Sequence, residues 1–138
     1  DDAGGAVACA ISMGRPFGLG LMPKGAGFLL APAPDAPGVS AKVLAPVIGI
    51  NIATNRLVFA AAAAGEGAIQ DVVAVTRAVV AENRALNQVA ENLPKTPGKR
   101  ATLINMLACS SAAEGAPVCA ARSDPRGDGY ALILAPKD

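Results

Sequence analysis

The most informative stretch of this chain reads Ala121-Arg122-Ser123-Asp124-Pro125-Arg126 and continues as Gly127-Asp128-Gly129-Tyr130. The proline ring fixes one backbone angle directly after Asp124, and this predicts a rigid turn. Two short apolar runs, 118–121 and 130–134, lie on either side of the turn. Because charges placed between two strands usually anchor loops by hydrogen bonds, we expect Asp124 and Arg126 to have a structural role.

Hydrophobic patterning predicts the elements around this turn. Apolar residues recur at three- and four-residue spacing over 68–83, which is typical of a helix. A second, short helix is expected over 86–92, ending before Pro94. Strands are predicted at 6–12, 28–30, 43–52, 56–60, 102–109, 118–121 and 130–134, with 61–67 as a loop into the first helix. Strands, two helices and then strands indicate an α+β fold with helices layered on sheet.

Length and composition narrow the class of protein. The 138 residues predict a single domain, 1–138. A net charge of +1 gives no electrostatic footprint for nucleic acid or for an anionic membrane. No apolar run approaches the ~20 residues of a membrane span, so no transmembrane segment is expected. The hydrophobic content of 52% favours either helices on a buried sheet or a subunit whose apolar face meets a partner.

Histidine and cysteine usage limits the chemistry. The sequence has no histidine, which excludes Ser-His and Cys-His catalysis and most zinc sites within this chain. Its three cysteines show no C-x-x-C spacing, so we expect no metal site. Cys109 and Cys119 flank a turn-rich loop, and two strands would bring them side by side. They are either a cross-strand disulfide, which implies an oxidising compartment and leaves Cys9 free, or two small buried hydrophobes.

Four stretches, in the same order along the chain, resemble the small subunit of the gamma-glutamyltranspeptidases. They are Asp2-Ala3-Gly4-Gly5-Ala6-Val7-Ala8, Pro16-Phe17-Gly18-Leu19-Gly20 with Gly25-Ala26-Gly27-Phe28-Leu29-Leu30, Leu86-Asn87 with Val89-Ala90-Glu91, and Ser123-Asp124-Pro125-Arg126. The resemblance covers most of the chain, with family segments shortened around 34–40 and 95–102. It implies the αββα sandwich of the N-terminal nucleophile hydrolases, here shortened and completed by a partner chain.

The resemblance also says where catalytic residues would lie. In that family a threonine at the start of the small subunit attacks the substrate, with its own α-amine as base. Asp1 aligns several residues past that threonine, so the position is absent from this sequence. Ser12 falls where the family keeps a second threonine, and Gly14 replaces an asparagine that helps to hold the substrate carboxylate. Asp35 is the one acid that survives where the family binds the substrate α-amine.

The remaining family positions are altered as well. A serine pair that binds the substrate carboxylate would lie near Lys42-Val43 and is gone. The glycine pair of the oxyanion hole would fall near Ala64-Gly65 or at Gly65 and Gly67 of Gly65-Glu66-Gly67, and Glu66 brings negative charge towards an anion site. Each remnant also has an ordinary interpretation. Ser12 is then a strand serine, Asp35 is a solvated loop carboxylate, and the glycines free the backbone before the helix.

These observations favour a non-catalytic relative of the gamma-glutamyltranspeptidase small subunit that acts as a structural and interaction component of a larger assembly. The alternative is a fragment of an active gamma-glutamyltransferase or amidohydrolase whose nucleophile lies upstream of Asp1. A third interpretation is a stand-alone binding module that uses the loop 14–27. The expected partner is a large-subunit-like polypeptide, with a symmetric copy as second choice, and no cofactor is expected. By its resemblance the chain would be periplasmic or otherwise exported, or cytoplasmic if Cys109 and Cys119 are reduced.

Overall fold

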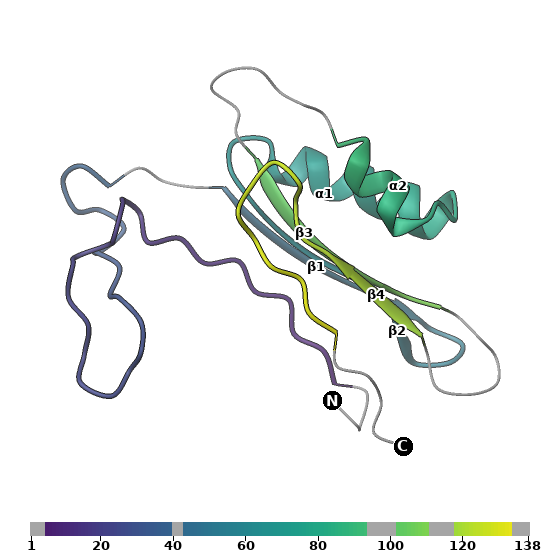
Figure 1. Cartoon of the computed structure of the whole chain (residues 1–138), viewed down its shortest axis with the longest axis horizontal. Helices are drawn as coiled ribbons and strands as arrows, with labels where there is room; N and C mark the ends of the chain where they lie inside the picture. The colour runs from purple at the N-terminus through teal and green to yellow at the C-terminus, as the bar shows by residue number, and fades with distance from the viewer. Residues whose placement is uncertain (1–4, 40–42, 94–101, 111–117, 134–138) are drawn as a thin grey trace.

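The computed structural model describes residues 5–39, 43–93, 102–110 and 118–133. A single antiparallel sheet of four strands carries a layer of helices on one face (Figure 1). The elements in chain order are β1 (Leu44–Asn51), β2 (Arg56–Ala64), α1 (Ala68–Thr76), the π-helical turn η1 (Arg77–Ala81), α2 (Leu86–Glu91), β3 (Leu103–Cys109) and β4 (Cys119–Arg122). A mixture of strands and two helices is therefore confirmed, in the order of a hairpin, two helices and two closing strands.

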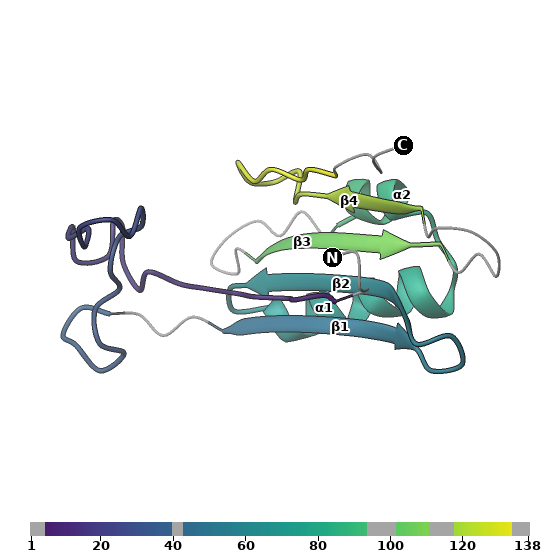
Figure 2. The same ribbon diagram turned by 90° about the horizontal axis from the view of Figure 1, so that it is seen from below.

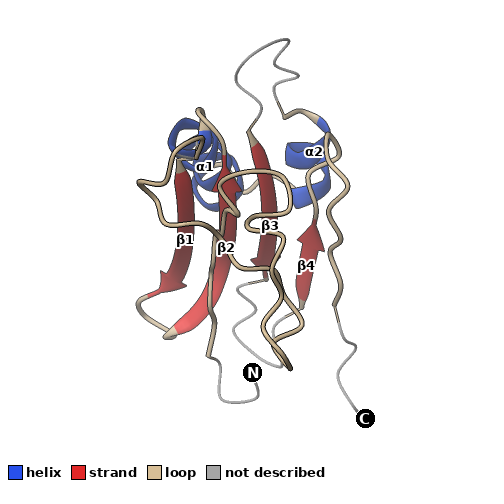
Figure 3. Ribbon diagram, turned by 90° about the vertical axis from the view of Figure 1, so that its left-hand side faces the viewer, coloured by secondary structure: helices blue, strands red, loops and turns tan. Residues whose placement is uncertain are grey.

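The strands lie in the order β1-β2-β3-β4, each antiparallel to its neighbour (Figure 3). The predicted hairpin around residues 53–55 is confirmed. Its turn is held by Asn51, whose Oδ1 accepts hydrogen bonds from the amides of Ala53 and Thr54 at 2.9 and 3.2 Å. Asn55 adopts a positive φ of 51°, which asparagine tolerates better than most residues.

The expectation that β2 ends at Ala60 is wrong. The strand continues through the alanines of 61–64, and Ala64 pairs with both Leu44 and Leu103. Alanine has a low intrinsic preference for strands, but hydrogen bonding to a strand on each side overrides that preference. The loop into α1 is therefore only 65–67.

One apolar core lies between the sheet and the helices. Phe59 and Ile104 are fully buried at its centre. The cluster consists of Phe59, Ala61, Ala63, Ala68, Val72, Val75, Ala78, Leu86, Val89, Ala90, Leu93, Ile104 and Met106. Small alanines on β2 let the helices approach the sheet closely, and the larger side chains of α2 fill the space beside them.

The helix predicted over 68–83 is interrupted. Regular α-helix ends at Thr76, and five residues of π-helix follow, with the amide of Glu82 bonded to the carbonyl of Arg77 at 3.0 Å. Asn83, at a positive φ of 50°, then reverses the chain, and the amide of Arg84 bonds to the carbonyl of Ala78 at 3.0 Å. The predicted second helix is confirmed as α2.

Extended segments lie on the face of the sheet opposite the helices. Residues 5–13 cross this face beside β1 and β2, and the chain after β4 returns along it (Figures 1 and 2). The strands predicted at 6–12 and 28–30 are absent, and residues 130–133 form no strand, while Leu134 lies outside the described residues. A strand requires hydrogen bonds to a neighbouring strand. Leu30 instead makes backbone hydrogen bonds to Leu19 and Leu21, within a loop.

In the part of the chain that the structure describes, no helix combines the length and the apolar character needed to cross a lipid bilayer.

Candidate functional site

A buried ion pair fastens the turn after β4 to the start of β3. The carboxylate of Asp124 accepts hydrogen bonds from Arg126 at Nε (2.8 Å) and at a terminal guanidinium nitrogen (2.7 Å). It also accepts the backbone amides of Arg126 at 2.8 Å and of Ile104 at 2.9 Å. Asn105 Oδ1 in turn accepts the amide of Asp124 at 3.3 Å. Asp124 is 3% exposed, so this is an internal clamp between two strands.

The protonation of the clamp follows from these contacts. Burial is the largest single influence on the Asp124 carboxyl and favours its neutral form, but the hydrogen bonds and the charge of Arg126, together with the Ile104 amide, outweigh it and lower its pKa. The hydrogen bond to Asp124 raises the pKa of Arg126 against the opposing effect of burial, and the charges of Asp124 and Asp71 add to the rise. Both groups therefore stay charged at neutral pH.

A glycine turn lies at the same end of the sheet and leads into α1. The amide of Gly65 donates to the carbonyl of Val43 at 2.9 Å, and the amide of Gly67 donates to Oγ1 of Thr102 at 3.0 Å. Gly65 has a positive φ of 131°, which favours glycine. A Cβ on Gly67 would lie 2.9 Å from the Thr102 hydroxyl, so this close approach also needs glycine. Glu66 between them is exposed.

The other two residues at predicted family positions, Ser12 and Asp35, lie in turns of the N-terminal segment. Ser12 Oγ accepts the amide of Gly14 at 3.0 Å and closes a small turn in the N-terminal segment. Asp35 is exposed in a turn of the loop that precedes β1. The hydrogen bonds around these two residues belong to the N-terminal segment, whereas Gly65 and Gly67 belong to the sheet end. Lys42, one of the pair that replaces the family's serines, lies outside the described residues.

Cys109 and Cys119 form a disulfide between the paired ends of β3 and β4. Of the two alternatives for these cysteines, the disulfide is the one observed. Cys9 is free and exposed. Since the clamp at Asp124 holds one end of the β3–β4 pair and the disulfide holds the other, this short edge strand is fixed at both ends.

The open face of the sheet carries a cavity of about 320 Å³. It lies where the N-terminal segment and the chain after β4 cross β2 and β3, and Val7, Cys9, Ala62, Leu107 and Leu132 are among the residues that line it. Most of these side chains are apolar. The cavity therefore has the character of an incompletely filled layer between the sheet and these segments.

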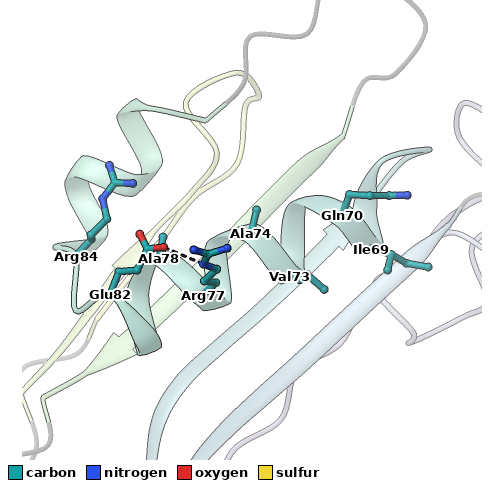
Figure 4. A pocket seen from close by; sticks show the side chains of 8 residues that line it. All are labelled: Ile69, Gln70, Val73, Ala74, Arg77, Ala78, Glu82 and Arg84. Atoms are coloured by element: carbon teal, nitrogen blue, oxygen red, sulfur yellow. Dashed lines mark hydrogen bonds and ion pairs between the residues drawn. The ribbon is translucent and has the colours of Figure 1, made fainter.

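A second hollow lies on the outer side of the helix layer. This shallow groove of about 600 Å³ is lined by Ile69, Gln70, Val73, Ala74, Arg77, Ala78, Glu82 and Arg84. Figure 4 shows Ile69 and Val73 along α1, with the three charged residues gathered at the other end. Arg77 Nε and Glu82 Oε1 form an exposed ion pair at 2.9 Å.

Within the described ranges, no group of three or more histidine, cysteine, aspartate or glutamate side chains is arranged to hold a metal ion. Thr102, whose hydroxyl accepts the hydrogen bond of the Gly67 amide, was not predicted from the sequence as part of this site. Its partner Gly67 lies 35 positions away, and only the folded sheet brings the two together.

Comparison with solved structures identifies the fold. The chain is similar to a mutant gamma-glutamyltranspeptidase of Helicobacter pylori, with 16% identity and a TM-score of 0.64 over 92% of this chain and 96% of that one. It is also similar to the gamma-glutamyltranspeptidase of Pseudomonas nitroreducens complexed with L-DON, with 18% identity and a TM-score of 0.61 over 98% and 96%. The transpeptidase enzyme CapD of Bacillus anthracis matches with 13% identity and a TM-score of 0.62 over 97% and 96%.

This chain has the fold of the gamma-glutamyltranspeptidases. The resemblance that the sequence motifs predicted is thus confirmed for the fold, and it extends over nearly the whole of each matched chain. At the level of sequence, no protein-family model and no curated protein matches.

Proposed function

We propose that this chain is a non-catalytic, single-domain relative of the gamma-glutamyltranspeptidase small subunit. It would serve as a structural and interaction component of a larger assembly, in which a partner chain completes an αββα sandwich. The observation that carries the proposal is the state of the glycine turn. An oxyanion hole needs backbone amides that are free to donate to the substrate. Here the amides of Gly65 and Gly67 already donate to Val43 and Thr102.

Charge at the turn supports the same conclusion. Glu66, exposed between the two glycines, would repel the negative charge that develops on a substrate oxygen. The ordinary interpretations of Ser12 and Asp35 agree with their local contacts, since one closes a turn and the other is an exposed loop carboxylate. The clamp of Asp124 and Arg126, in contrast, keeps both charges engaged within the protein. The family features that this chain retains therefore support the fold and not catalysis.

The open face of the sheet supports the role as a subunit. Leu44, Ile48 and Leu103 of β1 and β3 are only partly covered there, and the crossing segments expose Val7, Ile11, Tyr130 and Leu132. A face this apolar is typical of a surface that meets another protein layer. Strand-like segments without strand neighbours also invite pairing with an added strand. A large-subunit-like polypeptide that packs on this face would complete the second sheet of the sandwich.

The disulfide supports an exported location. Disulfides persist in oxidising compartments and are rare in a reducing cytosol. The Cys109–Cys119 bond therefore favours the periplasm or another exported location for this chain.

The test of the catalytic claim is release of a chromogenic aniline from a gamma-glutamyl anilide by the purified native assembly, with an active gamma-glutamyltranspeptidase as positive control. We expect no release above the uncatalysed rate. Turnover at ordinary enzyme rates, abolished when this chain is removed, would instead support a fragment of an active enzyme.

The interaction claim needs a separate measurement. We expect the isolated chain to aggregate or to melt without a cooperative transition, because its apolar open face is uncovered. Size-exclusion chromatography with light scattering, followed by thermal unfolding, is the direct measurement. A well-folded monomer with one sharp transition would refute the role as an obligate subunit.

A further inference from the structure

The outer face of α1 is apolar at positions where a surface helix is ordinarily polar. Ile69 and Val73 are 58% and 62% exposed, and Figure 4 shows both along the groove on the outside of the helix layer. Residues four apart share one face of a helix, so Ile69, Val73 and Arg77 form a single stripe. The opposite face of α1, with Val72 and Val75, is already buried on the sheet. The stripe is therefore separate from both the core and the open sheet face.

The two ends of this stripe carry opposite charge. Glu66 is exposed in the turn two residues before the start of α1. At the other end lie Arg77, Glu82 and Arg84, of which Arg77 and Glu82 neutralise each other as an ion pair. Arg84 thus supplies the net positive charge at that end. A surface that is negative, apolar and then positive is complementary to itself when two copies are related by a two-fold rotation.

We infer that a second copy of this chain binds in the groove, with the two α1 helices antiparallel across a two-fold axis near Val73. The spacing fits this arrangement. With a helix rise of about 1.5 Å per residue, the first residue of α1, Ala68, lies roughly 8 Å before Val73 and the last, Thr76, roughly 5 Å after it, so Glu66 and Ala78 lie beyond opposite ends of the helix. The amide of Arg84 is bonded to the carbonyl of Ala78, so Arg84 starts at that level. Each Glu66 then faces Arg84 of the partner copy, while Val73 packs on its own symmetry mate.

The association is weak and depends on concentration. One pair of short helices buries less than the ~1,600 Å² of a standard protein interface, and interfaces below that size are typical of weak, transient complexes. The surface is distinct from the open sheet face on which the proposed large-subunit-like partner packs. Loss of pairing between copies therefore leaves that partner bound, and failure of either proposal can be recognised separately.

Cysteine crosslinking on the native assembly tests the geometry, since a residue on a two-fold axis meets itself. In a Cys9→Ser background, which removes the free thiol, Val73→Cys should join two copies by a disulfide under mild oxidation. The matched control is Ile52→Cys, at a site in the β1–β2 turn that is 96% exposed, and it should crosslink far less at the same concentration. Equal crosslinking of the two variants, or a mass with one copy of the chain at every concentration, would overturn the inference. The inference would also be overturned if a different polypeptide protected the Val73→Cys thiol in an assembly that contains one copy of this chain.

Charge reversal tests the register without a new thiol. Glu66→Lys and Arg84→Glu should each raise the dissociation constant between copies roughly tenfold, because each change acts twice in a symmetric interface. The double variant, which restores opposite charges across the axis, should return close to the original value in sedimentation velocity. A double variant no tighter than the single variants would contradict the antiparallel pairing.

Discussion

The two faces of the one sheet differ in what covers them. On the helix side, α1, η1 and α2 bury Phe59 and Ile104 completely. On the opposite side, two extended segments run over the strands and leave large side chains such as Leu44 and Ile48 partly exposed (Figure 1). The helix side therefore buries an apolar core with residues of this chain alone. The other side carries apolar side chains like those of a protein interior, yet they are exposed like those of a surface. An additional protein layer would cover them.

The largest expected effect is on the helix side. Phe59→Ala should lower the free energy of unfolding by about 3–5 kcal/mol, because it removes a fully buried ring and leaves a cavity against the helices. Chemical denaturation of the native assembly measures this. The control is Ile52→Ala in the exposed turn, which should change stability by less than about 0.5 kcal/mol.

Truncation of an apolar side chain on the open side of the sheet provides the matching measurement of unfolding free energy. Ile48 is 39% exposed in this chain, so truncation to alanine should cost less than about 1 kcal/mol if nothing further covers it. If a partner layer packs there, we expect Ile48→Ala to cost about 2 kcal/mol in the assembly. A cost below about 0.5 kcal/mol in the assembly would mean that this face meets solvent, and the proposed sandwich would be wrong.

The second prediction concerns the clamp that holds the chain after β4 in place. Asp124→Asn keeps the shape of the side chain but removes its charge and the bidentate pairing with Arg126. Breaking one side of a buried ion pair costs about 3 kcal/mol. Asp128→Asn, at an exposed position of the same turn, is the control and should be nearly neutral. Equal stability of the two variants would show that the clamp does not hold the segment that crosses the open face.

The clamp also gives a pH dependence with a definite sign. The folded-state pKa of Asp124 is lowered, chiefly because its hydrogen bonds with Arg126 outweigh the effect of burial. A lowered pKa adds stability that is fully present above the unfolded value of about 3.9 and is lost as the pH falls through the folded value. The stability difference between the native chain and Asp124→Asn should therefore be constant near neutral pH and shrink below about pH 4. A difference that instead shrinks above pH 6 would point to another group.

The third prediction concerns the disulfide at the other end of β3 and β4. Replacing Cys109 and Cys119 together by serine should lower the free energy of unfolding by roughly 2–3 kcal/mol, as expected from the entropy of closing a short loop. Alkylation of the protein unfolded without reductant should label Cys9 alone, and reductant should expose all three thiols. Labelling of all three thiols without reductant would argue for a cytosolic location.

The comparison of the two sides also explains what could be predicted from sequence. The hairpin, α1, α2 and the closing strands depend on periodicity and turn residues within short windows, so their patterns were visible. Ala61–Ala64 carried no such pattern, because only pairing with β1 and β3 makes an alanine run a strand. The segments 6–12 and 130–133 had strand-like composition, but a strand also needs a neighbour. The sequence of a segment shows its preference for the strand conformation, but it does not show whether a neighbouring strand is present.

One part of the candidate site could be predicted from the sequence, and another part could not. The clamp was predictable because a proline turn between two apolar runs placed Asp124 and Arg126 two positions apart in sequence. The occupied glycine amides were not, because the Gly67–Thr102 contact spans 35 positions and depends on how the sheet end meets α1. The π-helical turn of η1 likewise left no signal in the spacing of apolar residues, since a change of one residue in the hydrogen-bond pattern barely alters that spacing.

The smallest expected effect belongs to the second ion pair, and it tests whether coverage, rather than contact distance, separates the two sides of the molecule. Arg77–Glu82 and Arg126–Asp124 have similar N–O distances, 2.9 and 2.7 Å, but their side-chain exposures are 76% and 41% for the first pair and 19% and 3% for the second. Water solvates the exposed pair and salt screens it, so Glu82→Gln should change the free energy of unfolding by less than about 0.5 kcal/mol. Thermal unfolding at low and high salt, run beside Asp124→Asn, makes the comparison directly. At protein concentrations below the dissociation constant between copies, a loss above about 1 kcal/mol for Glu82→Gln would mean that something other than a second copy covers the outer helix face, since only desolvation raises an ion pair of this geometry to that value.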